Sequence, residues 1–127
     1  MKLVAGLVIA GTLIVAIVII AAQQGAAGDG GQSDRIVFED LRFVPNRLDA
    51  KVGVPLRVRL TNNGTERHDI NFSSLHMPGL EGVQSILEPG ETRMITLTFN
   101  EPGTHSFVCS LPGHAAAGMT GAVFVTP

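Results

Sequence analysis

The sequence predicts an all-β fold, a Greek-key β-sandwich or barrel that is preceded by one N-terminal hydrophobic helix. Two observations predict the β-domain: apolar and polar residues alternate with a period of two after residue 34, and turn signals separate these runs. A third observation, a long apolar run at the N-terminus, predicts the helix. Together they divide the chain into a hydrophobic segment (1–22), a linker (23–33) and one domain (34–127).

The N-terminal segment has the length of a membrane-spanning helix. Every residue from Leu3 to Ala22 is apolar or small, and at about 1.5 Å per residue this run matches a hydrocarbon core about 30 Å thick. A secretory signal usually has only about 7–15 apolar residues, so an uncleaved anchor is favoured over a cleaved signal. Lys2 precedes the run and the next positive residue is Arg35, which predicts a cytoplasmic N-terminus. The domain is therefore expected on the extracytoplasmic side of the cell membrane, or secreted or periplasmic after cleavage.

The glycine-rich segment 23–33 (QQGAAGDGGQS) is predicted to be a flexible linker. A coil of this length spans about 18 Å. The domain would then stay near the bilayer yet remain free to reorient.

The strands of the domain are expected in runs separated by turns. Residues 56–60 and 95–99 alternate apolar and polar side chains, Phe107 and Cys109 share one face of a third run, and Val123 and Val125 share one face of a fourth. Turn signals lie at 54–55, 62–64, 89–90 and 102–103. Residues 73–87 have room for one short helical turn. About seven short strands are expected, which favours a Greek-key sandwich or barrel.

Composition excludes two classes of partner. Nine basic and eleven acidic residues give a net charge of −2, and no block of like charge occurs. Neither nucleic acid nor an anionic membrane surface is therefore indicated as a partner.

The only cysteine, Cys109, cannot form an internal disulfide, which leaves three alternatives. It is an inert buried thiol, a nucleophile with His114 as its base, or a metal ligand. The nucleophile would leave Met119 unexplained, and no oxyanion donors are indicated. The inert thiol would leave unexplained the Pro-Gly-His and Gly-Met sequences that follow in one turn-rich loop.

A metal site explains every part of the segment CSLPGHAAAGM (109–119). Thiolate and thioether are soft donors that favour copper(I), and imidazole suits both copper states. A single thiolate argues against structural zinc, which takes four strong nitrogen or sulfur ligands. Because blue-copper sites combine two histidines with one cysteine and a distant methionine, a second histidine is needed. His68, just past the turn after the strand at 56–60, is the candidate.

Residues 109–121 resemble the ligand loop of the cupredoxins, the small blue copper proteins. The Cys-x4-His-x4-Met spacing is most similar to that of auracyanins, sulfocyanins and rusticyanin, and the likeness covers most of residues 35–127. It implies a cupredoxin-like fold and one type-1 copper ion. The implied ligands are His68, Cys109, His114 and Met119. It also implies that backbone N–H groups of Asp69 and Leu111 donate to the cysteine sulfur.

The sequence departs from this family's pattern at two positions. The residue after the first ligand is often Asn, and here it is Asp69, so the resemblance leaves open the side-chain bond that ties the two ligand loops. His105 stands where an aromatic residue is common. His105 and His76 do not stand at ligand positions, and we expect each to be solvated or hydrogen-bonded.

The resemblance implies a carrier of single electrons between redox proteins, membrane-bound or soluble, and not an enzyme. Four protein ligands leave no open position for a substrate. Val108 and Ser110 flank the thiol where a coupled oxidase centre has histidines, and Gly113 stands where a dinuclear centre has a second cysteine. The alternative is a copper-trafficking or storage protein that binds copper without redox cycling. Four methionines, the initiator included, are too few for a methionine-rich storage motif.

The surroundings of His114 predict where electrons enter. Small residues flank this histidine, and no Asp, Glu, Lys or Arg follows Cys109 in the chain. A small, uncharged rim suits brief contacts between redox proteins.

Overall fold

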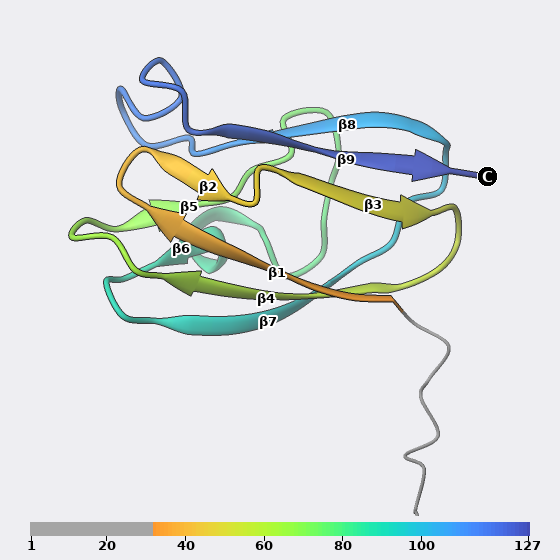
Figure 1. Cartoon of the computed structure of the whole chain (residues 1–127), viewed down its shortest axis with the longest axis horizontal. Coiled ribbons are helices and arrows are strands. Elements are labelled where there is room, and N and C mark those ends of the chain that lie inside the picture. Colours follow the sequence, from red (N-terminus) through yellow and green to blue (C-terminus); the bar gives the residue numbers. More distant parts are fainter. Residues whose placement is uncertain (1–31) are drawn as a thin grey trace, which may run out of the picture.

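The computed structural model describes residues 32–127, which form two β-sheets stacked as layers and a small third sheet at one end (Figure 1). The first sheet has the strand order β2-β1-β4-β7, the second β3-β9-β8, and the third pairs β5 with β6. The strands are β1 (Gln32–Glu39), β2 (Arg42–Val44), β3 (Arg47–Lys51), β4 (Leu56–Asn62), β5 (His68–Asp69), β6 (Ile86–Leu87), β7 (Thr92–Leu97), β8 (Gly103–Val108) and β9 (Thr120–Thr126).

The strands do not pair in the order of the chain, as they would in a β-meander. β1 pairs with β4 in parallel, and β3 pairs with β9 in parallel, whereas the other pairs are antiparallel. Parallel neighbours cannot be joined by a tight hairpin, so the chain crosses between the two layers. This arrangement confirms the all-β, Greek-key prediction.

Strand β4 shows why the alternating pattern folds as it does. Leu56, Val58 and Leu60 are fully buried, while Arg57 and Arg59 between them are exposed. One face of the strand therefore lies on the core between the sheets, and the other faces water.

A row of phenylalanines fills the core. Phe43 contacts Phe38 at 5.2 Å and Phe107 at 5.1 Å between ring centroids, both edge to face, and Phe72 lies 5.5 Å from Phe107. Aromatic pairs of this geometry stabilise a core beyond the area they bury. Because Phe107 is two residues before Cys109, the row also fixes the end of β8.

Several boundaries differ from the sequence prediction. The described residues contain nine strands and not about seven, because β5 and β6 have two residues each and are too short to show an alternating pattern. β7 ends at Leu97, although Phe99 beyond it still lies in the core. β1 begins at Gln32, so the last two residues of the expected linker belong to a strand.

The two helical predictions have different outcomes. The short turn expected within 73–87 is confirmed as the 3-10 helix η1 (Gly82–Ser85). The N-terminal hydrophobic helix falls on residues 1–22, which lie outside the described part of the chain. Within residues 32–127, no helix combines the length and the hydrophobicity that crossing a bilayer requires.

The sandwich has two distinct ends. The start of β1 and the C-terminus lie at one end, and the loop between β8 and β9 lies at the other, beside β5 (Figure 1). The predicted ligands are all in or next to β5 and the loop between β8 and β9.

Candidate metal centre

His68 is positioned by the buried side chain of Asn62, the last residue of β4. The Asn62 amide donates to the carbonyl groups of Glu66 (2.8 Å) and Leu87 (2.9 Å), and its oxygen accepts from the N–H of Gly64 (2.9 Å). These bonds close the turn that the sequence predicts at 62–64. The chain leaves this turn as β5, in which His68 is paired with Leu87.

A backbone bridge brings the His68 segment beside the cysteine. Asn71 and Val108 exchange two N–H to carbonyl bonds, each 2.9 Å long. Because Val108 precedes Cys109, the bridge aligns the two segments although they are about forty residues apart.

The loop 109–119 is closed by its own backbone. The N–H of Cys109 donates to the carbonyl of Met119 (3.0 Å), and the N–H of Met119 donates to the carbonyl of His114 (3.1 Å). Gly113 and Gly118 have φ values of 83° and 105°, which other residues rarely adopt. The glycines thus allow the tight path that returns Met119 to the start of the loop.

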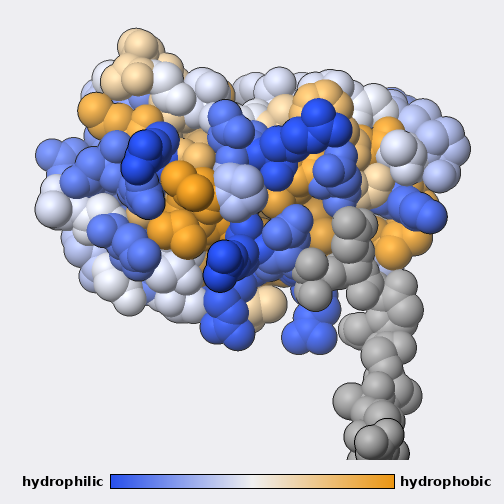
Figure 2. Space-filling view, in the orientation of Figure 1, coloured by the Kyte–Doolittle hydropathy of each residue, from blue (hydrophilic) through white to orange (hydrophobic). Residues whose placement is uncertain are grey.

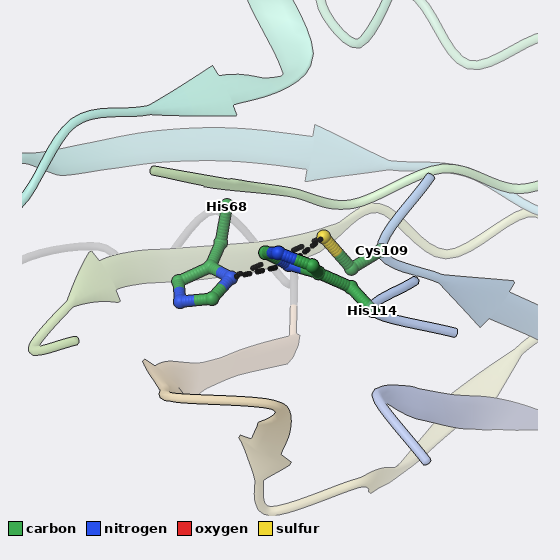
Figure 3. A group of neighbouring side chains, drawn as sticks. All are labelled: His68, Cys109 and His114. Carbon is green, nitrogen blue, oxygen red and sulfur yellow. Dashed lines mark hydrogen bonds between the residues drawn. The ribbon is translucent and has the colours of Figure 1, made fainter. Parts of the chain in front are cut away.

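Three of the four predicted ligands converge at the end of the sandwich (Figure 3). The Cys109 sulfur lies 3.3 Å from Nδ1 of His114 and 4.0 Å from Nδ1 of His68, and the two Nδ1 atoms are 3.1 Å apart. All three donor atoms lie within 4.8 Å of one another, in the only such metal-ligating group among residues 32–127. Cys109 and His68 are fully buried, and the His114 side chain is 12% exposed.

The fourth predicted ligand, Met119, is fully buried next to this group. Its backbone bonds join it to both Cys109 and His114. His76 and His105 lie elsewhere, as expected: His76 is exposed beside Glu81 (3.3 Å), and His105 lies 3.1 Å from the carbonyl oxygen of Glu101.

The cysteine thiol lies in a buried, hydrogen-bonded environment. Burial raises the pKa of the Cys109 thiol, and backbone N–H groups of Asp69 and Leu111 act in the opposite direction because they donate to the sulfur. Asp69 and Leu111 are the two residues that the resemblance implies as donors to the sulfur. Since a metal binds the thiolate and not the thiol, binding must release the thiol proton.

Asp69 ties the two ligand segments together in spite of its departure from the usual Asn. Its Oδ1 accepts from the N–H of Ser110 at 2.6 Å, and its Oδ2 accepts from the Ser110 hydroxyl. Asp69 is buried, being 3% exposed. The carboxylate thus provides the bond between the segments that the sequence left open.

Both histidines face a carboxylate with their outer nitrogen. Asp40 lies 3.4 Å from Nε2 of His68, and Glu66 lies 3.5 Å from Nε2 of His114. The backbone N–H and then the hydroxyl of Thr65 hold the pKa of Asp40 below its ordinary range. Neither Asp40 nor Glu66 was predicted from the sequence, because no local motif marks either of them.

The donor set fits copper. One thiol, two imidazoles and a neighbouring thioether are soft or intermediate donors, and the single sulfur anion does not match a structural zinc site. Each imidazole presents Nδ1 to the site and keeps Nε2 for an outer partner, which is how metal-binding histidines are held in proteins.

Comparisons with known proteins agree with this chemistry. The copper-resistant cuproprotein CopI of Pseudomonas aeruginosa is 25% identical over 144 residues, covering 80% of each chain. Auracyanin-B of Chloroflexus aurantiacus is 42% identical over 43 residues, or 34% of this chain and 18% of that protein. The solved auracyanin of Roseiflexus castenholzii shares the fold with a TM-score of 0.60 at 22% identity, covering 77% of this chain and 99% of the other.

The family model described as a cupredoxin-like domain matches residues 11–120, which is most of the chain. The chain therefore belongs to the cupredoxin-like family, and copper is its cofactor.

Proposed function

We propose that this protein is an exported carrier of single electrons, in which His68, Cys109, His114 and Met119 bind one type-1 copper ion. The observation that carries the proposal is the convergence of the cysteine sulfur and two Nδ1 atoms within 4.8 Å, fixed by hydrogen bonds from both segments. When bound, copper supplies a one-electron couple between Cu(I) and Cu(II). A mixed set of thiolate, imidazole and thioether suits both states.

The folded chain supports this role by holding its donors in place. Three sets of hydrogen bonds restrict the ligand segments. They are the side-chain bonds of Asn62, the backbone bridge between Asn71 and Val108, and the bonds that Ser110 donates to Asp69. Donors fixed in this way need little rearrangement when charge changes, which favours fast electron transfer. Four protein ligands leave no open position, so we infer that the protein is not an enzyme.

His114 is the proposed path between the site and the surface. It is the one partly exposed member of the converging group, at 12%, whereas His68 and Cys109 are fully buried. Ala116 and Ala117 beside it are exposed, and Figure 2 shows a weakly hydrophobic tip where the loop between β8 and β9 lies in Figure 1. A surface of small apolar residues suits short-lived contact with a redox partner.

The rim of His114 carries a charged side chain, although the sequence predicted an uncharged rim. Glu66, brought in from the His68 segment, lies 3.5 Å from His114 Nε2 and is 68% exposed. The loop itself carries no charge, so the error arose because Glu66 is far from it in sequence. A partner that approaches His114 would meet one carboxylate at the margin of an apolar tip.

The setting of the carrier is part of the proposal. Residues 1–22 would anchor it in the cell membrane with the copper domain on the extracytoplasmic side, or would be removed to leave a secreted or periplasmic domain. Its partners would be membrane-bound or soluble redox proteins that donate and accept electrons. Nucleic acid is not proposed as a partner, because the chain has a net charge of −2 and no basic block.

A second candidate function is copper trafficking or resistance without redox cycling. It is favoured by the relation to the copper-resistant cuproprotein CopI, which extends over 80% of this chain. The two functions differ in what leaves the protein, an electron or the metal.

One experiment separates them. The copper-loaded protein is reduced and reoxidised repeatedly in the presence of a Cu(I)-specific chelator, with the visible absorption and the chelator complex recorded together. An electron carrier should complete many cycles with its copper retained. Transfer of copper to the chelator within the first few cycles would instead favour trafficking. His68→Ala provides a control with weakened binding, which should lose copper under the same conditions.

A further inference from the structure

The outer nitrogen of His68 faces a carboxylate from a remote part of the chain. Asp40 belongs to the turn between β1 and β2, 28 residues before His68, and its Oδ1 lies 3.4 Å from Nε2. Figure 3 shows that this nitrogen points away from Cys109 while Nδ1 points into the site. The ring thus bridges Asp40 and the donor group.

Asp40 is held in this place by two further bonds. The N–H of Thr65 donates to Oδ1 at 2.8 Å, and the Thr65 hydroxyl donates to Oδ2 at 2.9 Å. Thr65 lies in the turn that leads to His68, so these two bonds join the turn that carries Asp40 to the His68 segment. The carboxylate is therefore fixed although it is 48% exposed.

The backbone around Asp40 is strained. Leu41, the next residue, has a φ of 64°, the only positive value among the non-glycine residues of 32–127, and its side chain is 42% exposed. A left-handed leucine is unfavourable, and Leu41 is not buried in the core, where packing could offset the strain. Strained residues of this kind often serve a site nearby. Here the turn delivers Asp40 to His68.

Gly64 leaves the space in which Asp40 and His68 meet. A Cβ atom at this position would lie 2.5 Å from Oδ1 of Asp40 and 2.9 Å from Nε2 of His68. Both distances are far inside van der Waals contact. The His68 ring is fully buried and the Asp40 side chain is 48% exposed, so a methyl group would displace Asp40 and not His68.

We propose that Asp40 is a positioning residue that sets the tautomer, the orientation and the oxidation-state preference of the site through His68. This inference rests on the proposed copper site. By accepting from Nε2–H, the carboxylate keeps Nδ1 unprotonated and aimed at the metal. Its negative charge also stabilises Cu(II) more than Cu(I), because Cu(II) carries the larger positive charge.

The carboxylate at the other histidine serves as an internal comparison. Glu66 lies 3.5 Å from His114 Nε2 but is 68% exposed, so water screens its charge more than that of the Thr65-bound Asp40. Glu66→Gln should therefore change the potential less than Asp40→Asn does.

Three variants separate contact from charge. Asp40→Asn keeps an acceptor but removes the charge, Gly64→Ala keeps the charge but displaces it, and Asp40→Ala removes both. Glu39→Gln is the matched control, since it removes the adjacent carboxylate, whose partner is Arg42. Each is measured for the reduction potential and the Cu(II) affinity of the loaded protein. Nitrogen NMR of the apoprotein reports the His68 tautomer without any metal.

The expected results form a pattern. All three variants should raise the potential, with Asp40→Asn changing the ratio of Cu(II) to Cu(I) affinity about tenfold, or about 59 mV for one electron. The Nε2–H tautomer should persist in Asp40→Asn and become mixed in Asp40→Ala and Gly64→Ala. Glu39→Gln should change the ratio of Cu(II) to Cu(I) affinity by less than twofold and should leave the His68 tautomer unchanged.

Two outcomes would overturn the inference. One is a ratio of Cu(II) to Cu(I) affinity, obtained from the potential, that stays within twofold of wild type in both Asp40→Asn and Asp40→Ala. The other is an unchanged His68 tautomer in Asp40→Ala. If Gly64→Ala does not fold, the two Asp40 variants decide alone. If the wild type shows no reversible copper couple, the proposed function fails, and the tautomer of the apoprotein still decides the role of Asp40.

Discussion

Replacing Asp69 tests how firmly the two ligand segments are joined. This buried carboxylate accepts two hydrogen bonds from Ser110, one from the backbone N–H at 2.6 Å and one from the hydroxyl. A hydrogen bond to a charged group contributes about 1.5–3 kcal/mol to stability. Because Ser110 is exposed and water can replace part of the loss, we expect Asp69→Ala to lower the free energy of unfolding by about 2–4 kcal/mol.

Two milder variants should lose less stability than Asp69→Ala. Ser110→Ala removes only the hydroxyl bond and should lower the free energy of unfolding by about 1 kcal/mol. Asp69→Asn retains an oxygen for the Ser110 N–H and should also lose about 1 kcal/mol. The expected order of stability is therefore wild type, then the two milder variants, then Asp69→Ala.

Urea unfolding of the copper-free protein measures these differences. The chain has no Trp or Tyr, so far-ultraviolet circular dichroism is the appropriate signal. An Asp69→Ala variant within about 0.5 kcal/mol of wild type, at an unchanged denaturant slope, would show that the bonds between Asp69 and Ser110 do not stabilise the fold. An Asp69→Asn variant that loses as much stability as Asp69→Ala would contradict the expected order.

Four further predictions follow from the site and its surroundings. Cys109→Ser should abolish the visible colour of the copper protein, because a hydroxyl is a poor donor for copper, and a variant that stays intensely coloured would contradict the ligand assignment. Met119→Gln should keep copper bound but lower the reduction potential measured by voltammetry, because an oxygen donor favours Cu(II). Gly121→Ala should lower the free energy of unfolding by about 1–3 kcal/mol, measured as a lower thermal midpoint, because its Cβ would lie 2.4 Å from the Phe107 ring and 2.6 Å from a backbone carbonyl oxygen. The N–H of Glu88 and then Arg93 lower the pKa of Glu91, so its stabilising contribution is present above its ordinary pKa and is lost as pH falls through the lowered value. The stability difference between wild type and Glu91→Gln should accordingly shrink on acidification.

The strands and the ligand loop could be predicted because their signals are local. The alternation at 56–60 reports one buried and one wet face of a strand, and β4 follows it. Cys109, His114 and Met119 lie within eleven residues, so their spacing alone groups them. His68 could be proposed because a turn signal places it at the end of a strand.

The pairing of strands could not be predicted from such patterns. Alternation shows which side chains are buried but not which strand lies alongside, so the parallel pairs β1–β4 and β3–β9 are apparent only in the structure. β5 and β6 are equally hidden, since a strand of two residues has no period to detect.

The groups around the ligands were missed for the same reason. Asp40 and Glu66 reach the histidines through folds of the chain that bring remote turns to one end of the sandwich. Asp69 was noticed only as a departure from the usual Asn, and its two bonds to Ser110 depend on the bridge between Asn71 and Val108. In each case the chemistry is set by tertiary packing and leaves no trace in the local sequence.

The most direct test of the proposed copper site is a titration of the copper-free protein with Cu(II), followed by visible absorption. We expect an intense band from charge transfer between the Cys109 thiolate and copper, which saturates at one equivalent. A reductant should bleach the band, and reoxidation should restore it without loss of copper. A protein that binds Cu(II) without an intense visible band, or that loses its copper on reduction, would contradict the proposed electron carrier.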